Sequence, residues 1–60
     1  MNIKEIRIKK GITQSELAEK LRITQGAVSQ WEQGLSTPKA DKLIEVATVL
    51  GCSVDELLRE

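Results

Sequence analysis

Small polar side chains with hydrogen-bonding chemistry cluster near the middle of this chain. Gln25 and Gln30 carry amides, and Ser29 carries a hydroxyl between them. An amide presents a donor and an acceptor together, which matches the N6 and N7 atoms of adenine in the major groove of DNA. Gly26 and Ala27 are small enough to let a helix approach a groove or a thymine methyl group closely. Residue types of this kind indicate recognition by hydrogen bonding.

Two short helical patterns, separated by a three-residue break, would position these side chains. The first pattern begins at Thr13, because Thr13 and Glu16 have the spacing of a capping box. Residues 22–24 form the break, and the second pattern ends at Gly34. A helix, a tight turn and a second helix with a polar outer face make the layout of a helix-turn-helix DNA-binding motif, expected here over residues 13–34.

Three further helices are expected around this motif. The first runs from about Asn2 to Lys10 and stops at Gly11, where a left-handed cap is needed. Thr37 and Pro38 have the types of an N-cap and a first helical residue, so the fourth helix is expected to begin there. A second capping box, opened by Ser53, begins a short last helix. With no alternating strand pattern, the fold class is all-α, a compact five-helix domain.

Each expected helix carries an apolar stripe, and short helices are stable only when such stripes pack together. Ile23 is expected to pack between the second and third helices and hold them together. Ile8 does not lie on the apolar stripe of the first helix and is expected to be exposed. The stripes consist of Ile3, Ile6, Leu17, Ala18, Leu21, Val28, Trp31, Leu43, Val46, Ala47, Leu50, Val54, Leu57 and Leu58.

The size and composition of the chain exclude several classes of function. Sixty residues are expected to form one domain, 1–60, which buries only about 60% of its unfolded surface and has little room for a catalytic cleft. The sequence lacks His and has one Cys, so no intrachain disulfide, zinc site or other metal site is expected. We expect no enzyme activity and no cofactor. No apolar run approaches the roughly 20 residues of a membrane span, and no signal peptide is recognisable.

Charge is distributed unevenly along a chain whose formal net charge is zero. Residues 1–22 carry six Lys or Arg against three Glu, whereas residues 43–60 carry one Arg against four Asp or Glu. A basic front could face phosphates while an acidic back faces solvent or a partner. Mixed charge that only keeps a small domain soluble explains the same pattern, so charge leaves both possibilities open.

The whole chain resembles the lambda-repressor-like helix-turn-helix family, also called the Xre or Cro/C1 type. The match runs in register over nearly the full length, which makes it more specific than a lone helix-turn-helix pattern. It is carried by Ile6-Arg7, Lys10-Gly11-Ile12-Thr13-Gln14, Glu16-Leu17-Ala18, Val28-Ser29-Gln30-Trp31-Glu32-Gln33-Gly34, Pro38, Leu43-Ile44, Ala47, Leu50-Gly51 and Ser53-Val54-Asp55-Glu56-Leu57-Leu58.

The resemblance implies two sets of DNA contacts. The base-contacting positions would be Gln25, Gly26, Ser29 and Gln30; in an unrelated helix these would simply be solvent-facing residues. Gln14 opens the second helix, where backbone N–H groups and the helix dipole favour an anion. The phosphate-contacting positions would be Gln14, Thr24, Ala27, Ser36, Thr37 and Lys39, with Lys9, Lys10 and Lys42 as weaker candidates and Lys20 as a solvated charge.

Other positions are better explained by structure. In the family, the residues matching Arg7 and Glu32 form an ion pair between the first helix and the end of the third. Trp31 is expected to pack rather than stack on bases, and Cys52 occupies a small apolar position of the core. Arg22 stands where the family commonly has Gly, because the backbone there often takes a positive φ.

The expected function is that of a sequence-specific, double-stranded DNA-binding transcriptional regulator, a repressor that occupies a palindromic operator as a homodimer. Leu35 and Leu58 are candidate dimer contacts. The expected location is cytoplasmic, in a bacterial, phage or plasmid context. The alternative is an antitoxin or another protein-binding module of the same fold, with the acidic C-terminal third as its partner surface.

Overall fold

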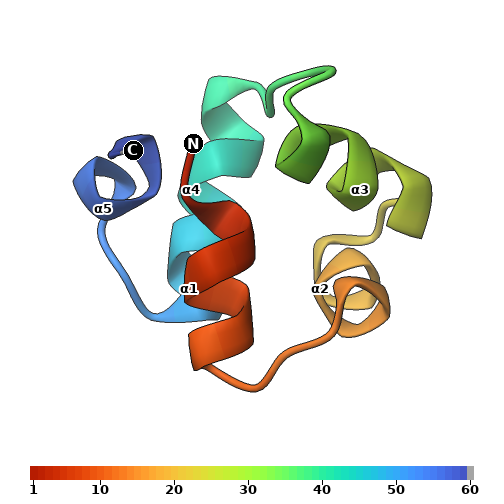
Figure 1. Cartoon of the computed structure of the whole chain (residues 1–60), viewed down its shortest axis with the longest axis horizontal. Helices are drawn as coiled ribbons and strands as arrows, with labels where there is room; N and C mark the ends of the chain where they lie inside the picture. Colours follow the sequence, from red (N-terminus) through yellow and green to blue (C-terminus); the bar gives the residue numbers. More distant parts are fainter. Residues whose placement is uncertain (60) are drawn as a thin grey trace.

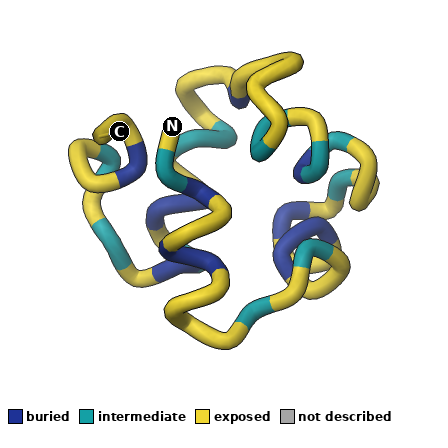
Figure 2. Tube along the Cα trace, viewed as in Figure 1, coloured by how far each residue is buried: buried dark blue, intermediate teal, exposed yellow. Residues whose placement is uncertain are grey.

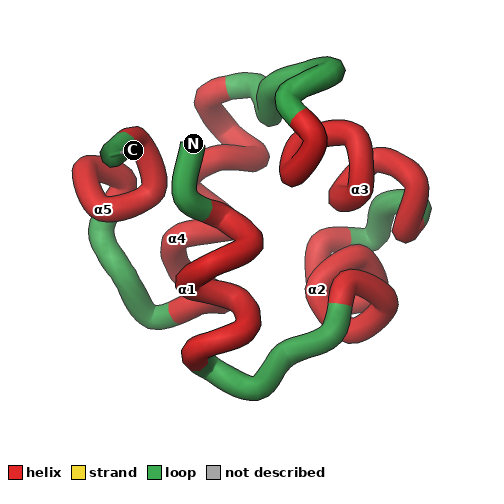
Figure 3. The backbone as a smooth tube through the Cα atoms, in the orientation of Figure 1, coloured by secondary structure: helices red, strands yellow, loops and turns green. Residues whose placement is uncertain are grey.

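The computed structural model describes residues 1–59, and within them every regular element is a helix (Figure 3). The five helices are α1 (Ile3–Lys9), α2 (Gln14–Leu21), α3 (Gln25–Gln33), α4 (Ala40–Leu50) and α5 (Val54–Leu58). Helices α1 and α4 lie between α2 and α3 on one side and α5 on the other (Figure 1). This arrangement confirms the expected all-α fold. Across the described range, no helix has the length and apolar character that crossing a membrane requires.

One hydrophobic core joins all five helices. Its members lie on the inward faces of the helices (Figure 2), as the apolar stripes predict except at Leu58, which is 52% exposed. Ile23 and Trp31 are partly buried and pack against this core, whereas Ile8 is 58% exposed, as expected from its position off the stripe. The side chains that are nearly fully buried are Ile3, Leu17, Leu21, Val28, Val46, Leu50 and Leu57.

Helices α2, α3 and α5 begin with side-chain caps. The hydroxyl of Thr13 accepts from the Glu16 N–H at 3.0 Å, and the Glu16 carboxylate accepts from the Thr13 N–H at 3.0 Å. Ser53 starts α5 with the same capping box, and Thr24 caps α3 by accepting from the Ala27 N–H at 3.2 Å. Each cap is worth about 1 kcal/mol, so three of the helix starts predicted from sequence are confirmed.

Four helices end in the same way, with a residue in the left-handed region. The next residue then donates its N–H back to a carbonyl five positions earlier, as in the bond from Ile23 to Ala18 at 3.0 Å. Gly does this after α1, α3 and α4. After α2 the residue is Arg22, at φ 59° and ψ 43°, a conformation that costs an L residue about 1 kcal/mol or more. The chain therefore keeps the turn expected from the family and tolerates the strain.

The predicted start of α4 is wrong. Helix α4 begins at Ala40 with Lys39 as its N-cap, rather than at Pro38 with Thr37 as the cap. Lys39 is extended, with φ −67° and ψ 162°, so Pro38 lies two residues before the helix. Pro38 is buried although its neighbours are exposed. Its fixed φ suits an extended segment as well as a first helical turn. Here Pro38 lies in the extended segment, with its ring buried.

Candidate functional site

The outward face of α3 is available to a partner. Gln25, Gly26 and Gln30 are exposed and Ser29 is half-buried. On the opposite edge, Val28 is fully buried in the core. The burial pattern explains this division, because the apolar edge holds α3 on the domain and leaves the polar edge outside.

An ion pair ties the far end of α3 to α1. Nε of Arg7 donates to Oε2 of Glu32 at 2.7 Å, and Nη2 of Arg7 donates to Oε1 at 3.0 Å. Nη1 of Arg7 also donates to the carbonyl oxygen of Ile12 at 2.8 Å. The two charged side chains are only 10% and 4% exposed. The pair expected from the family is thus a bidentate, shielded contact, the geometry in which Arg binds carboxylates best.

The same contacts keep Glu32 ionised. Burial opposes its charge, but hydrogen bonds from Arg7 and Gln14 and the positive charge of Arg7 outweigh burial and lower the pKa of the carboxyl group. Glu32 is therefore a carboxylate that accepts hydrogen bonds and donates none. Any side chain that forms a hydrogen bond with Glu32 must therefore act as the donor.

Gln14 connects this ion pair to the start of α3. Its Nε2 donates to Oε1 of Glu32 at 3.0 Å, and its Oε1 accepts from Nε2 of Gln25 at 3.4 Å. Oε1 of Gln25 in turn accepts from the hydroxyl of Ser15 at 3.0 Å. An interhelical chain of hydrogen bonds thus runs from α1 through α3 and α2 to Gln25. Ser15 was missed at the sequence level, because the contact depends on how α2 packs on α3 and leaves no local pattern.

The remaining candidate positions lie on α3, at its N-cap and in the loop that follows it. Thr24 is exposed, and Ala27 is partly buried on the first turn of α3. Ser29 accepts a hydrogen bond from Nε2 of Gln33 at 2.7 Å, so part of its capacity is used within α3. Exposed residues also occupy the loop between α3 and α4, where the candidates are Ser36, Thr37 and Lys39.

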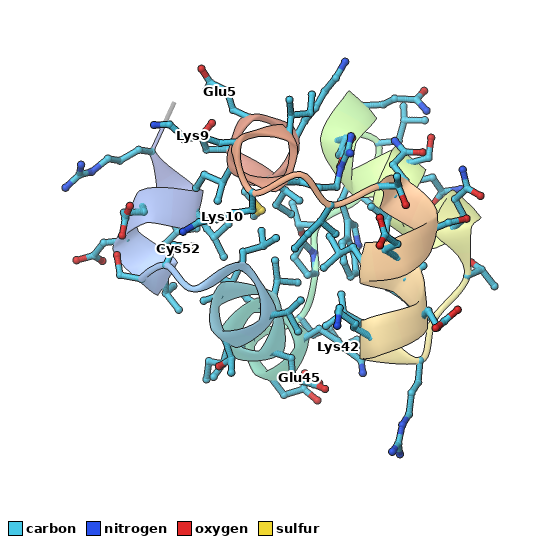
Figure 4. The ribbon with its side chains drawn as sticks, turned by 90° about the horizontal axis from the view of Figure 1, so that it is seen from below. Glu5, Lys9, Lys10, Lys42, Glu45 and Cys52 are labelled. Carbon is cyan, nitrogen blue, oxygen red and sulfur yellow. The ribbon has the colours of Figure 1, made fainter. Side chains whose placement is uncertain are left out.

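One of the weaker lysine candidates, Lys42, contacts other parts of the protein. Nζ of Lys42 donates to the carbonyl oxygen of Leu21 at 3.0 Å and lies 3.1 Å from the carboxylate of Glu45. Figure 4 shows Lys42 reaching from α4 toward α2, where it satisfies a carbonyl at the helix end. Lys10, by contrast, is exposed. The amine of Lys42 therefore already has partners within the fold, whereas a phosphate contact by Lys10 stays a prediction.

Cys52 packs against the core, in agreement with its expected role. Burial raises the pKa of its thiol, and the nearby carboxylate of Glu56 raises it further. A thiol with a raised pKa carries little thiolate at neutral pH and is a poor nucleophile. The charge and burial around Cys52 thus indicate a structural side chain.

Comparison with known proteins identifies the family of this chain. The model of a family described as helix-turn-helix matches residues 3–57. The chain belongs to this family. The lambda-repressor-like resemblance noted from the sequence is thereby confirmed, and the matched segment includes all five helices except the last residue of α5.

Individual relatives agree with the family. The chain is 38% identical over 58 residues to the uncharacterized helix-turn-helix-type transcriptional regulator YqaE of Bacillus subtilis, covering 97% of this chain and 50% of that protein. It is 34% identical over 56 residues to the transcriptional activator BcrR of Enterococcus faecalis, covering 93% of this chain and 28% of that one. The chain thus spans at most half of these curated relatives.

A solved structure has the same fold. It is the crystal structure of SinR, described as the master regulator for biofilm formation, in complex with DNA. Its sequence is 41% identical to this chain, its TM-score is 0.85, and the match covers 95% of this chain and 92% of that one. The helix arrangement described above is therefore one that occurs in a DNA-bound regulator.

Proposed function

We propose that this chain binds double-stranded DNA in a sequence-specific way and regulates transcription, as a repressor that occupies an operator. The observation that carries the proposal is the outward face of α3, where Gln25 is exposed and its amide is held by two neighbours. An amide fixed in this way can make a bidentate contact with adenine in the major groove. Gly26, Ser29 and Gln30 complete the proposed base-contacting surface.

Phosphate contacts would surround this surface. Gln14 begins α2, where N–H groups and the helix dipole favour an anion. Thr24 and Ala27 occupy the equivalent end of α3; the Ala27 N–H already donates to the Thr24 hydroxyl, which leaves the hydroxyl proton of Thr24 to donate to a phosphate. Ser36, Thr37 and Lys39 are exposed in the following loop. Such contacts position a protein on DNA without specifying sequence. We therefore assign the salt-dependent part of the affinity to Lys39, the one cation among these candidates.

The proposed DNA complex is a homodimer on a palindromic operator. Two symmetry-related α3 helices would enter successive major grooves about 34 Å apart. Leu35 is 71% exposed and Leu58 is 52% exposed, so both present apolar surface that a second copy would cover. These side chains are the proposed dimer contacts.

A protein-binding module is the second candidate function. Helix α5 contains Asp55 and Glu56 and lies on the opposite side of the domain from α3 (Figure 1). A partner bound there would leave the α3 face open but would compete with a second copy for Leu58 on the same helix. Failure to bind any duplex at low salt would favour the protein partner over DNA.

Selection of duplexes from a randomised pool tests the proposal. The wild-type chain should enrich sites related by a two-fold axis, with half-sites about one helical turn apart. Recovery of no preferred sequence would reject sequence-specific binding.

A further inference from the structure

We infer that Ser15 is a positioning residue that sets the orientation of the Gln25 amide and so contributes to base specificity, an inference that rests on the proposed function. Ser15 lies on α2, at the second helical position, and is exposed. Its hydroxyl donates to Oε1 of Gln25 at 3.0 Å across the α2–α3 junction.

The polarity of this contact follows from Glu32. A carboxylate only accepts, so Gln14 must turn its NH2 group toward Glu32 and its carbonyl oxygen toward Gln25. Gln25 then directs its own NH2 group to Gln14, at 3.4 Å, and its carbonyl oxygen to Ser15. Each amide in the chain therefore has one favoured orientation.

The remaining hydrogen-bonding capacity of Gln25 is complementary to adenine. An amide has two N–H donors and two acceptor lone pairs. Gln14 uses one donor and Ser15 uses one acceptor, which leaves one of each for a base. The contact to Gln14 is long, at 3.4 Å, so it would hold the amide only weakly if the hydroxyl of Ser15 were removed. An amide that rotates presents its donor and acceptor in the reverse order and no longer distinguishes bases as well.

Three variants separate positioning from other roles. Ser15→Ala removes the hydroxyl, Ser15→Thr keeps it, and Gln25→Ala identifies the base pair whose preference depends on Gln25. The probes are the duplex that wild-type protein selects from a randomised pool and the same duplex changed at that base pair. The ratio of the two dissociation constants measures discrimination. Thermal melting of each variant checks that the fold is kept, which we expect because Ser15 is exposed.

We expect Ser15→Ala to lower this ratio about fivefold, the value of one neutral hydrogen bond. Ser15→Thr should restore the ratio to within about twofold, and Ser15→Ala should have no further effect in a Gln25→Ala background. If Ser15→Ala discriminated between the two duplexes as well as wild type does, the inference about Ser15 would be wrong, while the proposed function would stand. An equal loss of affinity for both duplexes would also overturn it, because that result indicates a backbone contact. Failure of the wild-type chain to bind any duplex would instead reject the proposed function itself.

Discussion

The carboxylate of Glu32 accepts two hydrogen bonds from Arg7, at 2.7 and 3.0 Å, and so joins the end of α3 to α1. Its Oε1 atom also accepts from Gln14, the side chain that contacts Gln25. One ion pair thus joins two helices and limits how the proposed base-contacting amide can be oriented. The first two predictions concern this pair.

Replacing Glu32 with Ala should destabilise the domain strongly. The substitution leaves the guanidinium of Arg7 shielded and unpaired, which costs about 3 kcal/mol. A small domain has only about 3–5 kcal/mol of stability, so a large fraction should unfold. Urea denaturation measures the change. Glu45→Ala is the control, because the Glu45 side chain is 50% exposed and its pair with Lys42 should contribute less than about 1 kcal/mol. Similar losses in both variants would contradict this account.

Stability should fall in acid because of Glu32. Its pKa is lowered on folding, so its contribution is fully present above the ordinary value of 4.5 and is lost as pH falls through the lower folded value. The difference in free energy of unfolding between wild type and Glu32→Gln should therefore shrink below about pH 4.5. Glu16 and Glu56 also have lowered pKa values but are present in both proteins. A difference that stays constant from pH 7 to pH 3 would count against the assignment.

Arg22→Gly should stabilise the fold. Arg22 has φ 59°, and Gly adopts this conformation without the clash of a Cβ atom. Removing strain of about 1–2 kcal/mol is partly offset by the greater conformational freedom of Gly in the unfolded chain, so we expect the free energy of unfolding to rise by about 0.5–1 kcal/mol. Lys20→Gly, inside α2, is the matched control and should lower it by about 1 kcal/mol. Equal destabilisation of both glycine variants would show that the left-handed backbone at Arg22 carries no strain that Gly relieves.

Gly26→Ala should have opposite effects on folding and on DNA binding. A Cβ at this position would lie 3.8 Å from the hydroxyl of Thr24, an ordinary contact, and Ala favours helix by about 0.5 kcal/mol or more. The melting temperature should therefore rise slightly. Affinity for the selected duplex should fall several-fold, because the added methyl group separates α3 from the groove. Unchanged affinity would show that α3 does not approach DNA at Gly26.

Leu35→Ser combined with Leu58→Ser should weaken dimer formation on DNA. Both side chains are exposed in the isolated domain, so the fold should remain intact. Analytical ultracentrifugation with a two-half-site duplex should show more singly bound complex than wild type. Ile8→Ser is the control, since Ile8 is 58% exposed on α1. Strictly monomeric binding by the wild-type chain would reject the dimer.

Local sequence signals predicted most of the fold. Capping boxes identified the starts of α2 and α5, and the apolar stripes identified their buried faces, because both patterns act within one or two helical turns. The start of α4 was placed wrongly because Pro38 fits both a first helical turn and a buried extended segment. Only tertiary packing decides between these two uses.

The candidate site was less predictable for a related reason. The exposure of Gln25 follows from the helical period, but its contacts with Ser15 and Gln14 join residues 10 and 11 positions apart on two helices. The partners of Lys42 depend on packing in the same way, since Leu21 lies 21 positions earlier. Interhelical hydrogen bonds leave no periodic pattern in a sequence, so the structure was needed to find them.

The central claim is that the outward face of α3, beginning at Gln25, enters the major groove of DNA. Its most direct test is the affinity of wild type and Gln25→Ala for the selected duplex as a function of salt concentration. We predict that log K falls linearly with log salt in both proteins, with similar slopes, and that Gln25→Ala loses its preference at one base pair. Absence of binding at low salt, or an unchanged base preference in Gln25→Ala, would contradict the claim.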